Sequence, residues 1–212
     1  AAGTSKVTEV SDSGSVPELQ FLNEGDTPVL LLDGEELVGA KQNRVLNLSI
    51  LAPAHEAITI PVSCVERGRW SYSSRKFRTV DRVHYSRGRS AKAASVSSFM
   101  ATEGSRRSDQ SEVWQNISEK SARLNVSSQT DSMSDVYEDG KRAVEEFVRG
   151  STNTKNQIGA IFGIDGVVAG IDFFDASETF SKLMPKLVRS YALDAVETPV
   201  QGKSVMQIYE VC

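Results

Sequence analysis

Apolar residues in the first third of the chain come in short runs separated by polar turns. Residues 28–32 and 37–40 flank Asp33-Gly34. Glycine tolerates the positive φ of a tight turn, so this pattern predicts a β-hairpin. Residues 44–51 then alternate apolar and polar side chains, as expected of a strand with one buried face.

A further strand is predicted where residues 57–65 are rich in β-branched side chains. Pro61 lies inside this run and favours an edge position or a bulge, because proline cannot donate to a strand ladder. Residues 69–73 could continue the sheet. Together these runs predict an antiparallel β-sheet.

The middle of the chain changes to a helical period. Asp109 and Glu112 have the spacing of a capping box, and the apolar residues of 113–124 fall roughly on one face. A clearer apolar stripe at three- and four-residue spacing covers 133–148, and Gly150 follows it as a glycine that ends a helix does. Two helices are therefore predicted.

The C-terminal part predicts a hairpin, a helix and a strand. Residues 157–174 turn at Asp165-Gly166 and are apolar or glycine on both faces, which favours the centre of a sheet. An apolar stripe over residues 180–191 predicts the helix, and Pro185 should kink or split it. Residues 206–211 could form the last strand.

This order of elements predicts an α+β fold, with a mainly antiparallel β-sheet and about three helices packed on it. The 212 residues are enough for one large domain. Residues 1–15 are small and polar, and we expect a disordered tail there. We expect residues 16–212 to form a single domain.

Charge is unevenly distributed along the chain. The whole carries −4, but residues 75–107 contain nine basic and two acidic residues, so that segment carries +7. Its hydrophobic period is weak, and we expect residues 75–110 to form a basic, flexible connection with one strand near 80–85. It could also be a lid over an anionic ligand or a phosphate-tracking patch. Poor aromatic spacing argues against nucleic acid.

Cysteine usage and hydropathy bear on the compartment. The chain has two cysteines, Cys64 and Cys212, which give no disulfide framework. No apolar run is long enough for a membrane span, and the first residues lack the apolar centre of a signal peptide. We expect a cytoplasmic protein without membrane contact.

Metal and cofactor motifs are absent from the sequence. The only histidines, His55 and His84, form no metal-binding spacing with Cys64, and no phosphate-cradling glycine loop occurs. We therefore predict neither a metal nor a cofactor. Cys64 with a histidine base could be a nucleophile, but its apolar, β-branched surroundings favour a buried structural thiol.

Charged and amide side chains gather at the ends of neighbouring predicted strands. Lys41–Arg44 separate the second and third strands, and Glu66–Trp70 follow the next one. Arginine forks bind phosphate, amides read polar edges, and tryptophan offers a stacking face. The predicted ligand contacts are Gln42, Asn43, Arg44, Arg69 and Trp70. The alternative is ordinary solvated turns with surface ion pairs.

Three functions are compatible with these residues. The first is a binding or sensor module for a phosphate-bearing ligand. The second is a hydrolase-type enzyme on the same ligands, with Glu36 or Glu66 as general base and arginines stabilising developing charge. The third is a structural protein or homo-oligomer that uses the 133–148 helix face.

Long segments of the sequence resemble the ARPP-1 family, the ARG and Rhodanese-Phosphatase-superfamily-associated Protein 1 domain. The resemblance is carried by "LLLDGEELVGAKQNRVLNLSILAPA" and "ITIPVSCVERGRW", and by the later blocks "SDQSEVWQNI", "SDVYEDG" and "PKLVRSYALDA". The family is named for gene neighbourhoods with ADP-ribosylglycohydrolases, rhodaneses and phosphatases. The resemblance thus implies a role near NAD or ADP-ribose metabolism, and it carries over no catalytic residue.

Overall fold

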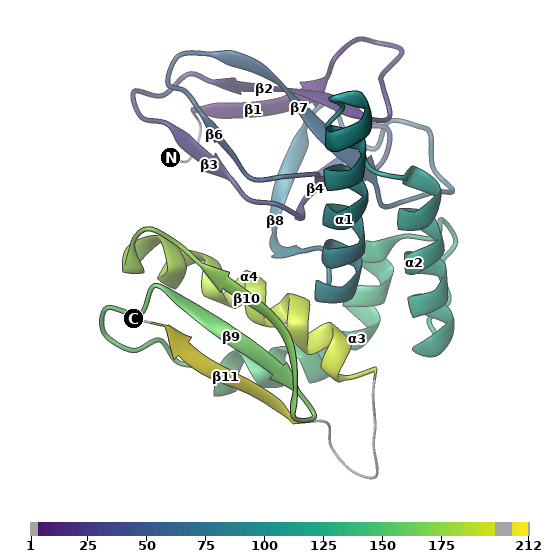
Figure 1. Cartoon of the computed structure of the whole chain (residues 1–212). Coiled ribbons are helices and arrows are strands. Elements are labelled where there is room, and N and C mark those ends of the chain that lie inside the picture. Colours follow the sequence, from purple (N-terminus) through teal and green to yellow (C-terminus); the bar gives the residue numbers. More distant parts are fainter. Residues whose placement is uncertain (1–3, 198–204, 212) are drawn as a thin grey trace. The chain divides into compact units, whose positions relative to one another are not determined.

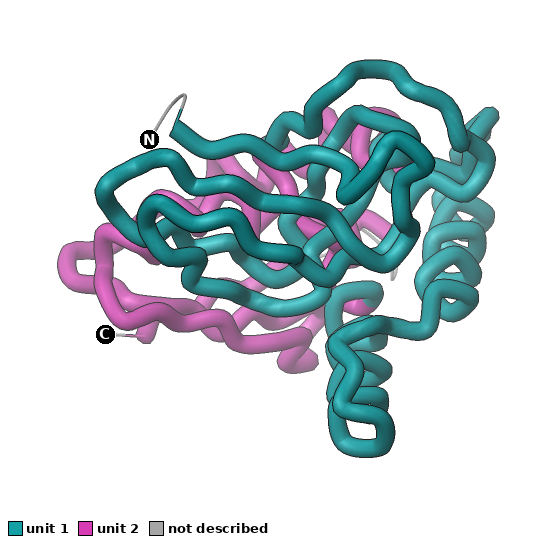
Figure 2. The backbone as a smooth tube through the Cα atoms, turned by 90° about the horizontal axis from the view of Figure 1, so that it is seen from above, with its two compact units in different colours: residues 1–80, 88–135 teal, residues 81–87, 136–212 magenta. Residues whose placement is uncertain are grey.

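A computed structural model describes residues 4–197 and 205–211. Its contacts group the chain into two compact units (Figure 2). Unit 1 comprises residues 1–80 and 88–135, and unit 2 comprises residues 81–87 and 136–212. A single domain over residues 16–212 stays a prediction.

Unit 1 is built on a curled sheet of six strands in the order β1-β2-β7-β5-β4-β8 (Figure 1). A separate pair, β3 and β6, is also antiparallel. The predicted antiparallel sheet is therefore confirmed. The strands are β1 (Ser5–Glu9), β2 (Glu18–Asn23), β3 (Val29–Leu31), β4 (Glu35–Gly39), β5 (Arg44–Leu46), β6 (Ile50–Ala52), β7 (Ala57–Cys64) and β8 (Phe77–Val83).

The predicted hairpin at Asp33-Gly34 is wrong, although the turn itself exists. Gly34 has a φ of +76°, as a turn glycine should. However, β3 pairs with β6 while β4 pairs with β5, so the chain passes from one sheet to the other at this turn. Sequence pattern identifies a turn but not the partners of the strands beside it.

Pro61 lies in an internal strand rather than at a sheet edge. Strand β7 pairs with β2 over residues 57–61 and with β5 over residues 62–64. Pro61 is thus the last residue paired with β2, where a missing N–H costs the ladder least.

Residues 5–9, predicted to belong to a disordered tail, form strand β1. All five pair with β2, and Val7 is buried in the core opposite Phe21. The pattern of one apolar residue between polar neighbours is too short to distinguish a strand from a tail without knowledge of β2.

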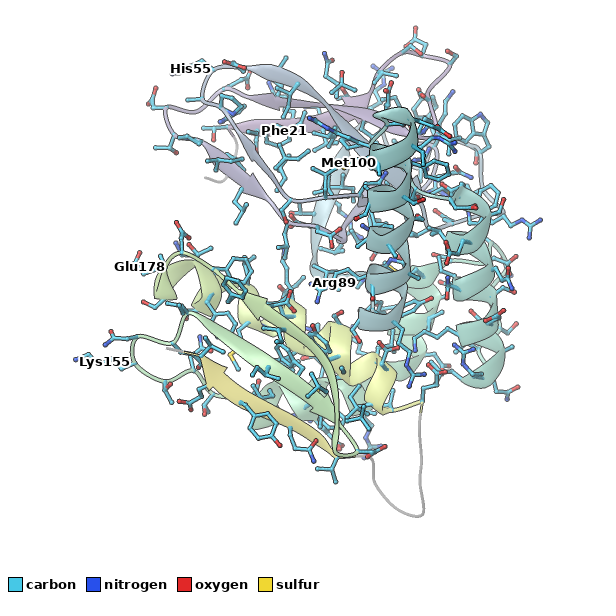
Figure 3. The ribbon with its side chains drawn as sticks, in the orientation of Figure 1. Phe21, His55, Arg89, Met100, Lys155 and Glu178 are labelled. Atoms are coloured by element: carbon cyan, nitrogen blue, oxygen red, sulfur yellow. The ribbon has the colours of Figure 1, made fainter. Side chains whose placement is uncertain are left out.

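The core of unit 1 lies on one side of the six-stranded sheet and is completed by β3 and β6. Phe21 is part of it (Figure 3). Successive strand residues point to opposite faces, so every second residue contributes. The buried residues are Val7, Leu19, Phe21, Leu31, Leu37, Ala40, Leu46, Ala52, Ile60, Val62 and Phe77. We call this side the core-facing side of the sheet.

The basic segment is not a flexible connection. Strand β8 is followed by a helix, α1 (Ser86–Glu103), so the described part of the chain has four helices, close to the three expected, and the α+β fold is confirmed. The hydrophobic period does not reveal α1 because its buried face includes a charged residue, Lys92. Lys92 donates to Asp33 Oδ1 at 2.5 Å and to the Asn47 carbonyl at 2.9 Å. Helix α2 (Gln110–Arg123) follows, with Asp109 as the predicted cap.

Unit 2 contains most of α3 (Met133–Gly150), together with α4 (Ser177–Ala195) and a sheet in the order β10-β9-β11. The predicted hairpin is confirmed: β9 (Gly159–Ile164) pairs with β10 (Val167–Phe173), and β11 (Met206–Val211) completes the sheet. Helix α4 packs on it through Tyr191, whose ring stacks on Phe162 at 3.9 Å.

Two expectations for unit 2 need correction. Only β9 is central, whereas β10 is an edge strand that exposes Ile171 and Phe173. Helix α4 is not split, because Pro185 is accommodated inside a helix that runs on to Ala195. In α3, Val136 and Val144 of the apolar stripe are buried. The homo-oligomer stays a prediction.

Candidate ligand-binding site

Arg44 is the largest fully buried side chain in unit 1. It lies on β5 directly opposite Cys64 of β7, and the pair two positions along the ladder, on the same face, is Leu46 and Val62. Because Leu46 and Val62 belong to the core, Arg44 projects from the core-facing side of the sheet. A guanidinium therefore stands at the end of an apolar core.

One nitrogen of the Arg44 guanidinium donates hydrogen bonds, and the other two have no hydrogen-bond partner in the described chain. Nη1 donates to Gln42 Oε1 at 3.1 Å and to the Asn43 carbonyl at 3.4 Å. Among residues 4–197 and 205–211, Nε and Nη2 have no hydrogen-bond partner. These two nitrogens form one edge of the planar group, so a complete two-pronged donor is left unused.

Burial dominates the electrostatics of Arg44. It lowers the pKa of the guanidinium, and Cys64, Glu9 and Glu66 partly oppose that shift by attraction, while Arg69 adds to it. Burying a cation without a hydrogen-bonded counter-ion is costly. An anion that accepted hydrogen bonds from the free nitrogens of Arg44 would offset this cost.

Trp70 lies against the Arg44 guanidinium and Lys41 lies against Trp70, and we call these two side chains the cover of the site. The Trp70 ring centre lies 5.7 Å from the Arg44 guanidinium carbon, and Trp70 is 48% exposed. Lys41 Nζ lies 5.3 Å from the Trp70 ring and 5.1 Å from the Tyr72 ring. It also donates to two carbonyls of residues 11–14, which we call the 11–14 turn, at 2.7 and 2.6 Å.

Glu66 and Arg69 form an internal network beside this site. Glu66 accepts from Arg69 Nε at 2.9 Å and Nη2 at 2.6 Å, from the Asn43 amide at 3.0 Å, and from Thr130 at 3.2 Å. Arg69 Nη1 donates to the Ala40 carbonyl at 2.7 Å. Both side chains thus hold loops together, and Glu66 has no vacant oxygen with which to act as a general base.

Glu36 lies on the other side of the sheet from Arg44, and Asn43 connects the two regions, because its Oδ1 accepts from Arg69 Nη2 at 3.2 Å. Glu36 pairs with Val45, one position from the Leu37–Arg44 pair, so it projects from the opposite side of the sheet. It accepts from Ser134 Oγ at 2.7 Å, and Asn43 Nδ2 donates to the same hydroxyl at 3.2 Å. The two candidate bases, Glu36 and Glu66, therefore do not meet at Arg44.

Cys64 is a buried thiol, as the sequence predicts. Burial raises its pKa, and Arg44 opposes that shift. Gln110 pairs with its backbone, accepting from the amide at 2.7 Å and donating to the carbonyl at 2.9 Å. His55 is exposed in a loop beside Asp26 (Figure 3), and His84 belongs to unit 2. The Cys64 nucleophile hypothesis gains no histidine base within unit 1.

Glu9 is a further residue of this site, and the sequence pattern does not predict it. It lies on β1 opposite Leu19, and it shares the core-facing side with Val7. Its Oε1 accepts from the Lys41 amide at 3.4 Å, whereas Oε2 is buried without a partner in the described residues. Glu9 is two residues after the core residue Val7, so it lies on the same face of β1. The sequence can show this only if residues 5–9 are first recognised as a strand.

The Glu9 carboxylate lies close to Lys41 and Trp70. A Cβ placed on Gly14, in the 11–14 turn, would be 3.3 Å from Glu9 Oε2, 3.3 Å from Lys41 Cδ and 3.4 Å from Trp70 Cζ2. Glu9, Lys41 and Trp70 therefore converge under this glycine, and φ of +74° makes the turn dependent on it.

Other parts of the described chain suit a phosphate less well. A cavity of about 530 Å³ in unit 2 is lined by Glu146 and Glu210 together with neutral residues, and its described lining offers no arginine or lysine to offset the repulsion between these carboxylates and an anion. Residues 4–197 and 205–211 hold no cluster of three or more metal-binding side chains. They also include no helix with the length and hydropathy to span a bilayer.

Fold and site together define an α+β protein with a curled antiparallel sheet and a buried, partly unpaired arginine at one end of its core. The chain belongs to the ARPP-1 family, the ARG and Rhodanese-Phosphatase-superfamily-associated Protein domain, whose model matches residues 1–210. The family's name suggests an ADP-ribose-related context. No curated protein and no solved structure matches the chain.

Proposed function

We propose that unit 1 is a binding module for a small phosphate-bearing ligand of the ADP-ribose or nucleotide class. The observation that carries this proposal is Arg44, fully buried and with Nε and Nη2 unpartnered in the described chain. A phosphate accepts two parallel hydrogen bonds from such an edge, and a charge-assisted pair of this kind is among the strongest polar contacts.

The surroundings of Arg44 fit a ligand with a flat ring. Trp70 has its ring beside the guanidinium and is half exposed, so a base could stack on it. Lys41 adds a second positive charge at the same cover. Because Arg44 itself is not exposed, the ligand would enter by displacing Trp70 or the 11–14 turn.

The other predicted contacts take supporting roles in this proposal. Gln42 holds the Arg44 guanidinium through Nη1 and thereby sets the direction of the free edge. Asn43 and Arg69 fix the adjoining loops through Glu66. In this proposal Arg44 contacts the phosphate directly, and Trp70 stacks on the base. A role in NAD or ADP-ribose metabolism and a cytoplasmic location remain part of the proposal.

Calorimetry with ADP-ribose, NAD and ribose 5-phosphate tests the proposal. We expect saturable binding of at least one of them to the full chain. Arg44→Lys retains the charge but loses the two-pronged edge, and should weaken binding about tenfold or more. Arg78→Lys, at an exposed position of β8, should change affinity less than about twofold.

Two outcomes would contradict the proposal. One is the absence of heat with all three ligands. The other is equal affinity of wild type and Arg44→Lys for a ligand that binds. Thermal unfolding of Arg44→Lys, compared with wild type, ensures that any loss of binding comes from a folded protein.

A further inference from the structure

We propose that Glu9 recognises a hydroxyl group of the ligand bound at Arg44, so that the site selects sugar phosphates over phosphates that lack a neighbouring hydroxyl. This inference rests on the proposed function and adds a specificity-determining residue to it. Its basis is a pair of buried, unpartnered groups of opposite kind: a donor edge on Arg44 and an acceptor oxygen on Glu9.

Strand register places both groups on the same side of the sheet. Glu9 is opposite Leu19, and Leu19 is opposite Ile60 of β7. Arg44 is opposite Cys64, four residues beyond Ile60 on the same strand. Residues four apart on a strand share a face, so Glu9 and Arg44 both project from the core-facing side.

Both side chains lie beside Trp70. The Trp70 ring centre is 5.7 Å from Arg44 Cζ, and a Cβ placed on Gly14 would lie 3.3 Å from Glu9 Oε2 and 3.4 Å from Trp70 Cζ2. The charge of Glu9 accordingly opposes the lowering of the Arg44 pKa. Yet Arg44 Nε and Nη2 and Glu9 Oε2 all lack a hydrogen-bond partner in the described residues. A group held between them would have to accept hydrogen bonds from Arg44 and donate one to Glu9.

This requirement defines the chemistry of the ligand. The oxygens of a phosphate monoester accept from Arg44, but above its second pKa of about 6 the group has no proton to give Glu9, and its charge is repelled by the carboxylate. A sugar hydroxyl donates. A ligand with a phosphate and a nearby hydroxyl therefore satisfies both groups, whereas a phosphate monoester without a hydroxyl pairs with Arg44 and is repelled by Glu9.

Glu9→Gln tests this inference because it removes the charge and changes the shape little. We expect its affinity for ribose 5-phosphate to fall about tenfold, as a charge-assisted hydrogen bond becomes a neutral one. Its affinity for methyl phosphate, a monoester without a hydroxyl group, should rise or stay the same at about pH 8, because the like charge is gone. Glu18→Gln, on an exposed position of β2, is the matched control and should leave both affinities unchanged.

The outcomes separate this inference from the proposed function. If Glu9→Gln binds both ligands more tightly, or binds both as wild type does, Glu9 recognises no hydroxyl although the site binds phosphate. If wild type binds neither ligand, the proposed function fails and this inference fails with it. If Glu9→Gln does not fold, the affinities of the wild-type protein for two ligands test the inference. It should bind ribose 5-phosphate about tenfold or more tightly than methyl phosphate. Equal affinity for the two ligands would overturn the inference.

Discussion

Replacing Glu66 by glutamine should destabilise unit 1 strongly, because this carboxylate is the centre of a buried network. Glu66 is buried and accepts four hydrogen bonds, two of them from Arg69. An amide of the same shape keeps one oxygen but turns an NH₂ group toward donors. At least one donor of Arg69, Asn43 or Thr130 is then left facing another donor.

The size of the effect follows from the groups that lose their partner. A hydrogen bond to a charged group contributes about 1.5–3 kcal/mol. The Arg69 side chain is 16% exposed and would lose its counter-ion, but that exposure makes the loss smaller than the cost of a fully buried charge. We therefore expect Glu66→Gln to lower the free energy of unfolding by about 2–4 kcal/mol.

Urea unfolding followed by tryptophan fluorescence measures this change directly. Both tryptophans of the chain, Trp70 and Trp114, belong to unit 1, so the signal reports on that unit. The control is Glu18→Gln, which should stay within about 0.5 kcal/mol of wild type. A Glu66→Gln protein as stable as wild type would refute the structural role assigned to Glu66 and reopen its role as a base.

Two further predictions concern stability. Lys92→Met leaves Asp33 without its cation and should cost about 2–4 kcal/mol in urea unfolding, whereas the exposed Lys76→Met should change little; equal stability of both variants would show that the Lys92 pair contributes nothing. A hydrogen bond from Arg189 holds the pKa of Glu145 below its usual 4.5, so this pair stabilises unit 2 above that pH and the contribution is lost as pH falls through the lower, folded-state pKa. The stability difference between wild type and Glu145→Gln should therefore be about 1 kcal/mol or less at pH 7 and should vanish toward about pH 3; a difference that grew in acid would contradict the assignment.

The sequence predicts most local elements of this protein because their signals are local. The cap at Asp109, the apolar stripe of α3 and the Asp165-Gly166 hairpin all depend on residues within one or two turns of each other. Strand partners are different. The Asp33-Gly34 turn is correctly placed, yet β3 and β4 belong to separate sheets because their partners lie farther along the chain.

The candidate site is predicted in part for the same reason. Arg44 and Trp70 are brought together, as residues at the ends of neighbouring strands should be. Glu36 is not, because a strand alternates its side chains and a single-residue offset sends it to the opposite side. Glu9 is absent from the prediction because β1 was not predicted. Buried charge also misleads hydropathy, as Lys92 in α1 shows.

If Arg44 Nε and Nη2 bind a phosphate-bearing ligand next to Trp70, as we propose, the fluorescence of Trp70 should report the binding directly. Trp114→Phe leaves Trp70 as the only tryptophan, so its emission reports on the cover of the site. Titrating ADP-ribose into this protein should change the emission saturably, and adding Arg44→Lys should raise the Kd about tenfold or more. An emission unchanged by ADP-ribose, or a Kd unaffected by Arg44→Lys, would contradict the claim.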